Sequence, residues 1–116
     1  MGKLTTHILD TAQGRPAGDV RIELFSMDGP PIRLLETRTN SDGRCDAPLL
    51  SGDAFRPGRY QLVFHVGEYF AAQGLPVAEP AFIDQVPLAF GVADAQAHYH
   101  VPLLVSPWSY STYRGS

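Results

Sequence analysis

Apolar and polar residues alternate one by one along parts of this chain, and this alternation limits its fold more than any other feature. In residues 20–24 (VRIEL) three apolar side chains alternate with two charged ones, and residues 60–66 (YQLVFHV) repeat the pattern. Successive side chains of a β-strand point to opposite faces, so the pattern is typical of a half-buried strand. Further strand candidates are residues 4–9, 32–38, 82–90 and 97–105.

Turn signals separate these candidates. The 11 glycines and 10 prolines are spread along the chain, and four clusters rich in turn residues break it into short segments: residues 13–16 (QGRP), 28–31 (DGPP), 40–43 (NSDG) and 56–58 (RPG). Only residues 68–73 (EYFAAQ) read as helical, because helix formers there are followed by Gly74, a natural C-terminal cap. The sequence predicts one all-β domain over residues 1–116, a two-sheet β-sandwich of seven to eight strands with one short α-helix.

Composition narrows the possible partners. A net charge of −3 and scattered basic residues provide no basic surface for nucleic acid or for an acidic membrane. No apolar run approaches the ~20 residues of a membrane span, and the first ten residues lack the apolar core of a signal peptide. The single cysteine, Cys45, cannot form an internal disulfide or a cysteine-based metal cluster, which suits a reducing compartment. We therefore expect a cytoplasmic protein with no nucleic-acid partner and no membrane partner.

Two histidines flank a tyrosine in the last long strand candidate. His98 and His100 therefore point to the same face of that strand, as Thr5 and His7 do in the first strand candidate. Two such histidines with a third from elsewhere would form a three-histidine zinc site with an open fourth position. No carboxylate close in sequence completes such a site, and the simpler interpretation of each histidine is a hydrogen-bonded strand residue. For His65, inside an alternating strand, we expect the latter.

Arg44 follows the turn at residues 40–43. Gly43 is expected to supply the positive φ of this turn, which then places Arg44 at the start of the next strand. An arginine in this position is either a solvated charge or a clamp for a planar, oxygen-rich substrate, which a guanidinium binds through paired hydrogen bonds. The pattern leaves both interpretations open.

Three separated motifs together resemble the transthyretin-like 5-hydroxyisourate hydrolases. They are residues 4–10 (LTTHILD) followed by 14–17 (GRPA), residues 39–44 (TNSDGR), and the ending from 98–104 (HYHVPLL) to 113–116 (YRGS). The resemblance covers the whole chain in order. It implies the transthyretin-like (prealbumin-like) fold and a homotetramer, a dimer of dimers with the active site in a cleft between two dimers. It also implies an enzyme of urate catabolism that hydrolyses 5-hydroxyisourate to 2-oxo-4-hydroxy-4-carboxy-5-ureidoimidazoline.

The resemblance implies a site as well. The implied catalytic residues are His7, Arg44, His100 and Ser116, and the implied substrate-binding residues are His7, Arg44, His98, Tyr113, Arg114 and Gly115. His98 has a supporting place in this set. The terminal residues 113–116 are expected to fold back into the active-site cleft, which a longer tail would fill.

The chemistry of the reaction suggests how these residues act. We expect His100 and His7 to transfer protons, because a neutral imidazole, with an ordinary pKa of about 6.5, is suited to take a proton from water near pH 7. Arg44 is expected to hold substrate oxygens and to stabilise the negative charge that grows on the attacked carbonyl.

Three other interpretations of these residues are a hormone carrier, a covalent serine mechanism and a zinc hydrolase. Transthyretin uses the same fold to carry thyroid hormone, but it lacks the histidines, the arginine and the YRGS ending found here. A covalent mechanism through Ser116 would lack the strained turn of a serine nucleophile. A zinc hydrolase would use the histidines as metal ligands, and they would then not be free to transfer protons. We therefore expect catalysis with no metal and no cofactor.

Overall fold

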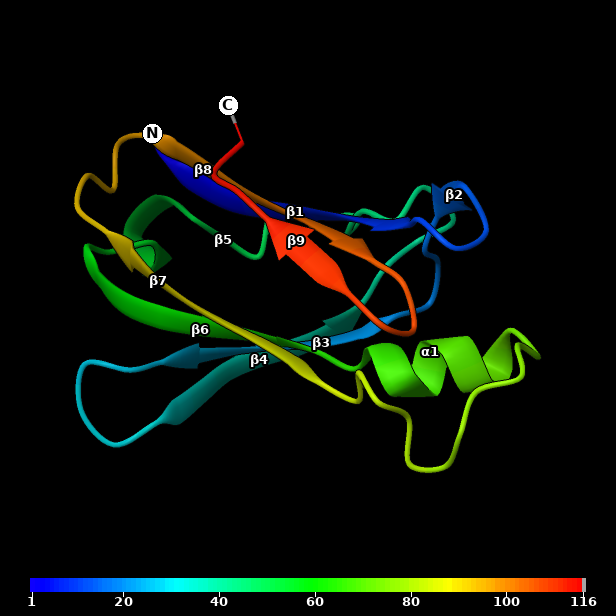
Figure 1. Cartoon of the computed structure of the whole chain (residues 1–116). Coiled ribbons are helices and arrows are strands. Elements are labelled where there is room, and N and C mark those ends of the chain that lie inside the picture. Colours follow the sequence, from blue (N-terminus) through cyan, green and yellow to red (C-terminus); the bar gives the residue numbers. More distant parts are fainter. Residues whose placement is uncertain (116) are drawn as a thin grey trace.

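The computed structural model describes residues 1–115, which form two β-sheets packed face to face with one α-helix at the end of the sandwich (Figure 1). The elements of this part of the chain follow in the order β1 (Lys3–Asp10), β2 (Arg15–Pro16), β3 (Arg21–Ser26), β4 (Ile32–Arg38), β5 (Leu50–Ser51), a 3₁₀ turn (Gly52–Ala54), β6 (Gly58–Phe64), α1 (Val66–Ala72), β7 (Val86–Val92), β8 (His98–Val105) and β9 (Tyr110–Thr112).

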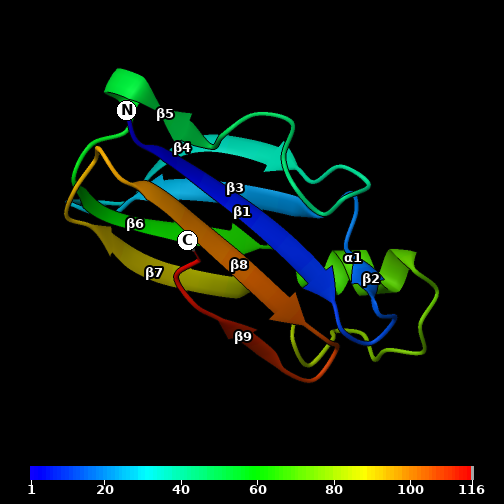
Figure 2. The ribbon, with the colours of Figure 1, turned by 90° about the horizontal axis from the view of Figure 1, so that it is seen from above.

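The strand order brings the first and the last long strand together. One sheet has the order β2-β1-β8-β9, with β5 also paired to β1, and the other has the order β4-β3-β6-β7. The strands β1 and β8 are parallel neighbours, with Lys3 opposite His98 and Thr5 opposite His100, and Figure 2 shows them side by side. This pairing joins the motif around residues 4–10 to the one around residues 98–104.

The core lies between the two sheets and is formed by the inward-pointing side chains of the alternating strands. Fully buried examples from the two sheets are Leu4, Ile8 and Leu103 on one side and Ile22, Leu62 and Phe64 on the other. Each such side chain contributes roughly 1.5–3 kcal/mol by its burial. Because these positions fill the interior, the alternate positions of β1 and β8 point outward, and the candidate site lies on this outward face.

The expected two-sheet β-sandwich with one short helix is confirmed, and the differences are local. The described residues form nine strands where seven to eight were expected, because β2, β5 and β9 are only two or three residues long. The helix begins at Val66 instead of Glu68 and ends at Ala72, and Gly74 has the positive φ of 75° expected of a residue after a helix. No helix in residues 1–115 is long and apolar enough to cross a membrane.

The strand expected at residues 82–90 begins only at Val86. Its first part is a loop in which Phe82 is 79% exposed. The backbone there is used differently: the carbonyl oxygen of Asp84 accepts a hydrogen bond of 2.8 Å from the N–H of Gly67, at the start of α1. The expected start was wrong because these residues bind the beginning of the helix and do not pair with β6.

Candidate active site

An open cleft of about 420 Å³ lies on the outward face of the five-stranded sheet, the face seen from above in Figure 2. We call it the histidine cleft. Strand β1 contributes Lys3 and Thr5, strand β8 contributes His98 and His100, and residues 44–48 form the remaining wall. The cleft therefore combines two imidazoles with the guanidinium of an arginine.

A threonine hydroxyl joins the two histidines of this cleft. The Oγ1 atom of Thr5 lies 2.7 Å from Nε2 of His98 and 2.8 Å from Nδ1 of His100. The two rings have their centroids 6.1 Å apart. Both histidines thus lie on the face that the alternation predicted, and the parallel register of β1 and β8 places Thr5 between them.

Arg44 reaches the cleft because the turn before it is bound to β1. The carbonyl oxygen of Gly43 accepts a hydrogen bond of 2.8 Å from the N–H of Ile8, and Arg44 pairs with His7 in an isolated antiparallel bridge. Gly43 has the expected positive φ, 74°, and a Cβ atom at this position would collide with the Ile8 carbonyl. Arg44 was expected to begin a strand, but it lies in this single bridge, ahead of β5.

The side chain of Asn40 stabilises the same turn. Its Oδ1 atom accepts hydrogen bonds from the N–H groups of Asp42, at 2.9 Å, and of Arg44, at 3.2 Å. This arrangement is the local cap that an asparagine at the start of a turn provides. The result is a fixed backbone position for Arg44 beside β1.

Burial and the charge of Arg44 lower the pKa of two histidines. The pKa of His7 and the pKa of His100 are both lowered, first by burial and then by the positive charge of Arg44. For His100, the neighbouring His98 and His7 lower the pKa further. In residues 1–115 no carboxylate lies within ion-pair distance of the Arg44 guanidinium. The cleft therefore offers the imidazole of His100, which can accept a proton, next to a guanidinium that has no ion-pair partner in residues 1–115.

Of the C-terminal residues, Gly115 lies against His100. Its N–H donates a hydrogen bond of 2.8 Å to the His100 carbonyl oxygen, and this bridge continues the antiparallel register of β8 and β9. A Cβ atom on Gly115 would stand 2.7 Å from Cδ2 of the His100 ring. Ser116, which was expected in the catalytic set, lies outside the described residues.

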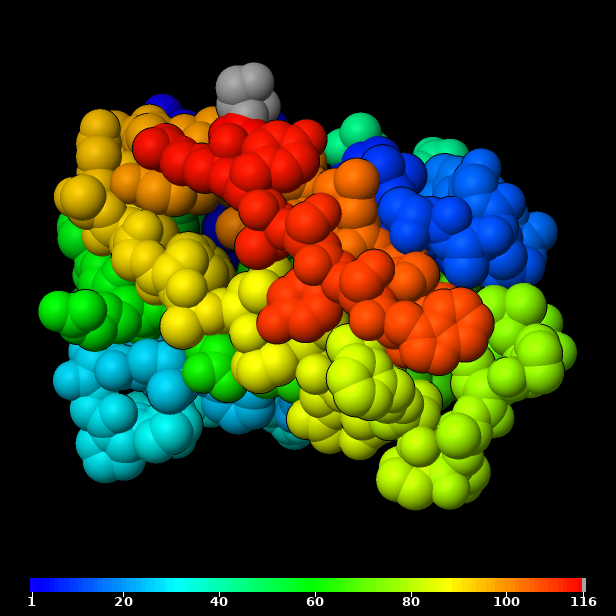
Figure 3. All heavy atoms as spheres, viewed as in Figure 1, coloured from blue at the N-terminus to red at the C-terminus, as the bar shows by residue number. Residues whose placement is uncertain are grey.

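Tyr113 and Arg114 lie elsewhere in the single chain. The Arg114 guanidinium stands over the ring of Tyr99, with Cζ 4.0 Å from the ring centroid. Tyr113 and Arg114 line a second groove of about 270 Å³ between β7 and β9, which we call the edge groove. Figure 3 shows the C-terminal segment, in red, beside the yellow segment that includes β7. Neither residue lines the histidine cleft of its own chain.

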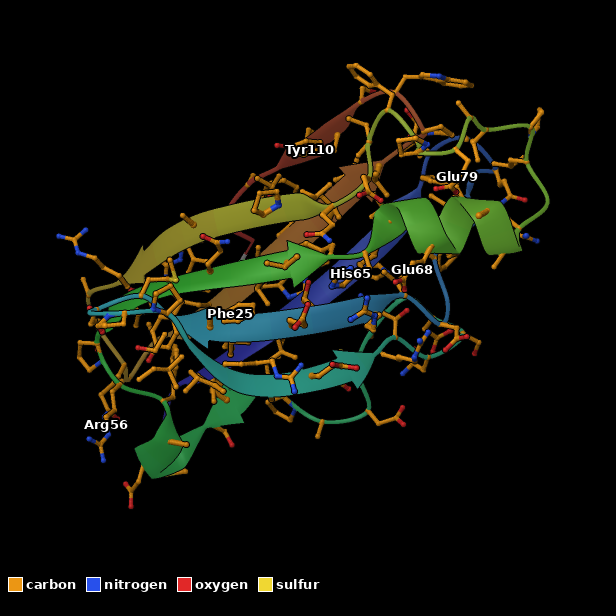
Figure 4. The ribbon with its side chains drawn as sticks, turned by 90° about the horizontal axis from the view of Figure 1, so that it is seen from below. Phe25, Arg56, His65, Glu68, Glu79 and Tyr110 are labelled. Atoms are coloured by element: carbon orange, nitrogen blue, oxygen red, sulfur yellow. The ribbon has the colours of Figure 1, made fainter. Side chains whose placement is uncertain are left out.

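The histidines do not form a metal centre with the other described residues. Within residues 1–115 no three His, Cys, Asp or Glu side chains are arranged to hold a metal ion. His65 lies on the outward face of the other sheet, next to Glu68 (Figure 4). Its Nε2 atom is 2.6 Å from Glu23, so the expected hydrogen-bonded role is confirmed, although the residue precedes α1 and is not inside a strand.

Comparison with known proteins identifies the family. A family model described as the HIUase/Transthyretin family matches residues 4–115. The chain belongs to the HIUase/transthyretin family. Among curated members, a 5-hydroxyisourate hydrolase of Ralstonia nicotianae is 61% identical over 117 residues, covering 100% of both chains. One of Pseudomonas aeruginosa is 59% identical and covers 100% of this chain and 93% of the relative.

Solved structures of the HIUase/transthyretin family share the fold. The structure of an (S)-allantoin synthase has a TM-score of 0.94 and 48% identity; it covers 99% of this chain, which spans only 44% of that longer protein. Sea bream transthyretin in complex with thyroxine has a TM-score of 0.86 but 28% identity, covering 97% of this chain and 94% of the other. The same sandwich thus occurs in proteins whose names state different functions.

Thr5 lines the histidine cleft, but no role for it was predicted from the sequence. Alternation placed Thr5 on one face with His7, but it does not tell which strand lies next to β1. The parallel neighbour β8 brings Thr5 within hydrogen-bond distance of two imidazoles. The only sequence signal for this role was that the first and the last motif both resemble the same family. That these two motifs lie close together depends on the fold.

Proposed function

We propose that this chain is a 5-hydroxyisourate hydrolase. It adds water to a ring carbonyl of 5-hydroxyisourate and breaks the ring C–N bond, so that the six-membered ring opens to 2-oxo-4-hydroxy-4-carboxy-5-ureidoimidazoline. The observation that carries the proposal is the full-length identity of about 60% to hydrolases of that name. The histidine cleft supports it, because water addition to a carbonyl needs a base for the water proton and a positive group for the oxyanion.

His100 is the principal proton acceptor in this proposal. Its Nδ1 atom is taken by Thr5, which leaves Nε2 to face water. When Nε2 removes a proton from the attacking water, the water oxygen bonds to the carbonyl carbon. The same proton then goes to the ring nitrogen as the C–N bond breaks. His7, whose pKa is lowered in the same way, is the second member of the proton-transfer pair.

Arg44 and the chain end hold the substrate. The guanidinium of Arg44 binds oxygens of the planar substrate and stabilises the charge that develops on the attacked carbonyl. Gly115 lies against His100 and keeps the terminal backbone beside the base. We assign substrate contacts to His98, Tyr113 and Arg114 and a water-positioning role to Ser116.

The assembly proposed for this enzyme is a homotetramer, a dimer of dimers. The histidine cleft is open and lies on a sheet face, so a second pair of subunits is needed to enclose a substrate there. Tyr113 and Arg114, which lie away from this cleft in their own chain, then belong to the interface. We further propose that the protein is cytoplasmic, in keeping with the free thiol of Cys45.

The likeness to transthyretin in complex with thyroxine makes a hormone-type carrier the second candidate. Both candidates are tested on one preparation. The protein at catalytic concentration should speed the loss of freshly made 5-hydroxyisourate far above its spontaneous decay, and it should not bind thyroxine at micromolar concentration. Thyroxine binding with no effect on 5-hydroxyisourate would favour the carrier and contradict the enzyme.

Proton transfer by free imidazoles requires no metal or cofactor. His98 and His100 each use one ring nitrogen in the hydrogen bond with the Thr5 hydroxyl, and in the proposed reaction the free Nε2 of His100 takes a proton and binds no metal. We expect full activity after exhaustive chelation. Activity that is lost on chelation and restored by zinc alone would show that the histidines act as ligands.

A further inference from the structure

The hydrogen bonds of Thr5 constrain the protons of both histidines in the cleft. A threonine hydroxyl carries one proton, so Oγ1 can donate to only one of the two ring nitrogens that lie at 2.7 and 2.8 Å. Among residues 1–115 the Thr5 hydroxyl has no other acceptor for its proton, so it donates to one ring nitrogen and accepts a hydrogen bond from the other. The protonation of His98 and the protonation of His100 are therefore linked through Thr5.

Two arrangements satisfy this constraint, and they differ in what His100 can do. In the first, Nδ1–H of His100 donates to Thr5, and Thr5 donates to Nε2 of His98. Nε2 of His100 then carries a lone pair and is a base. In the second, Thr5 donates to Nδ1 of His100, whose proton is on Nε2, and Nε2–H of His98 donates to Thr5. Nε2 of His100 then has no lone pair for a water proton, and its N–H can only donate a hydrogen bond.

We propose that Thr5 is a positioning residue that sets His100 as the base and relays its proton to His98. This inference rests on the proposed hydrolysis. As Nε2 of His100 takes a proton from water, the Nδ1 proton moves to Thr5 Oγ1 and the Thr5 proton moves to Nε2 of His98. Three O–H or N–H bonds form and three break. One positive charge arises on His98, the hydroxide bonds to the carbonyl carbon, and the reverse relay returns the proton to the leaving nitrogen.

The surroundings of the two rings favour this direction of charge transfer. His100 is half-buried and close to Arg44, whose positive charge opposes an imidazolium there. His98 is exposed to solvent, which stabilises a charged ring. Burial and Arg44 thus favour a neutral His100 before the reaction, and the relay places the positive charge on the ring where it is more favourable.

A purely structural role for Thr5 would predict different behaviour. Thr5 lies on the outward face of β1 and contributes nothing to the core. Valine has the same shape and an equal preference for strands, so Thr5→Val should leave the sandwich intact. The hydroxyl is the only group removed.

The test compares Thr5→Val with Thr5→Ser, which keeps the hydroxyl, and with Thr37→Val, the same change on β4 of the other sheet. With melting temperatures matched, Thr5→Val should lower kcat about 100-fold, the cost of a misplaced base, with little change in KM. Thr5→Ser should retain most of kcat, and Thr37→Val should retain all of it.

His98→Gln should lower kcat, and combining it with Thr5→Val should cause no further loss of kcat. Unchanged kcat in Thr5→Val, or losses that multiply in the double variant, would overturn the relay.

A second measurement does not depend on the substrate. Two-bond ¹H–¹⁵N spectra of the imidazoles should show the Nδ1–H form of His100 in the wild type and in Thr5→Ser, and a change of tautomer in Thr5→Val. An identical His100 spectrum in all three proteins would contradict the role of Thr5. If the wild type does not hydrolyse 5-hydroxyisourate, the proposed function fails, whereas this spectrum still decides whether Thr5 sets the tautomer.

Discussion

At the scale of single residues, Arg44 and burial act together on His7 and His100. Both effects lower the pKa of each imidazole, so protonation of these rings is harder in the folded protein than in a free peptide. Each ring therefore stays neutral, and able to accept a proton, to a lower pH than the ordinary pKa of about 6.5 would allow. For the same reason, acid destabilises the fold, because the unfolded chain binds these protons more readily.

The lowered pKa values of His7 and His100 predict how the reaction depends on pH. We expect kcat/KM to fall as the pH is lowered. The midpoint of this acid limb should lie below 6.5, because the neutral base becomes protonated only below that pH.

Arg44→Gln should lower kcat about 100-fold or more through loss of charge stabilisation. In an NMR titration it should also raise the pKa of His7 and of His100. An acid limb above 6.5 in the wild type, or unchanged histidine titrations in the variant, would contradict the role given to Arg44.

The contact between Gly115 and His100 can be tested by one methyl group. Gly115→Ala places Cβ 2.7 Å from the His100 ring, so either the ring or the terminal backbone must shift. We expect kcat to fall by about 10- to 100-fold with an unchanged melting temperature. Gly29→Ala is the matched control, because its Cβ would meet nothing within 4 Å. Equal activity in the two variants would show that the chain end is not needed beside the base.

At the scale of elements, one edge of β1 is completed by short pieces of chain. Strand β5 pairs with its beginning, the Gly43–Arg44 segment bonds its middle, and β2 pairs with its end. The Gly43–Arg44 segment carries the guanidinium of the site, so a change in how this segment packs against β1 should affect both stability and activity.

Gly43→Ala should disturb both properties. An alanine at a φ of 74° costs about 1–2 kcal/mol of stability, and its Cβ would also press on the Ile8 carbonyl and push Arg44 away from β1. Gly14→Ala is the control, because Gly14 has a φ of 69° but open space around it. Chemical denaturation should show a larger loss for Gly43→Ala, and only this variant should lose activity. Similar effects in both variants would mean that the Gly43 contact does not position Arg44.

The elements that the sequence predicted are those with a long alternating pattern. The strands β3 and β6 follow directly from residues 20–24 and 60–66, since their apolar side chains meet in the core. The short strands β2, β5 and β9 were missed, because two or three residues form a strand only through the partner they pair with. Residues 82–85 look like a strand in sequence, but their backbone bonds the start of α1.

The functional site was likewise predicted only where a local sequence pattern determines it. The shared face of His98 and His100 follows from their spacing, and the turn before Arg44 follows from residues 40–43. The link through Thr5 requires the parallel pairing of β1 with β8, which no local pattern encodes. The separation of Arg114 from the cleft likewise depends on its stacking on Tyr99.

At the scale of the whole molecule, the outer edges of the two sheets have no further strand paired to them among residues 1–115. The edge groove between β7 and β9 is open, and its lining residue Tyr113 is 62% exposed. Trp108, in the loop between β8 and β9, is 68% exposed. Exposed edge strands and apolar patches are typical of surfaces that other subunits cover, and identical subunits pair most readily about two-fold axes.

We therefore expect light scattering at micromolar concentration to give four times the chain mass of 12.7 kDa. Dilution that dissociates this assembly should abolish activity in parallel, because in the proposed tetramer a second pair of subunits encloses the histidine cleft. A fully active monomer of 12.7 kDa would contradict the proposed site between dimers.

The most direct measurement is the ultraviolet absorbance of freshly made 5-hydroxyisourate as it decays with and without the enzyme. The wild type at catalytic concentration should make this decay much faster than the spontaneous reaction. His100→Asn, folded and assembled like the wild type, should lose about 10²–10⁴-fold of the catalysed rate, the usual contribution of a positioned acid–base group. A wild-type rate equal to spontaneous decay, or a His100→Asn variant as fast as the wild type, would contradict hydrolysis by the histidine cleft.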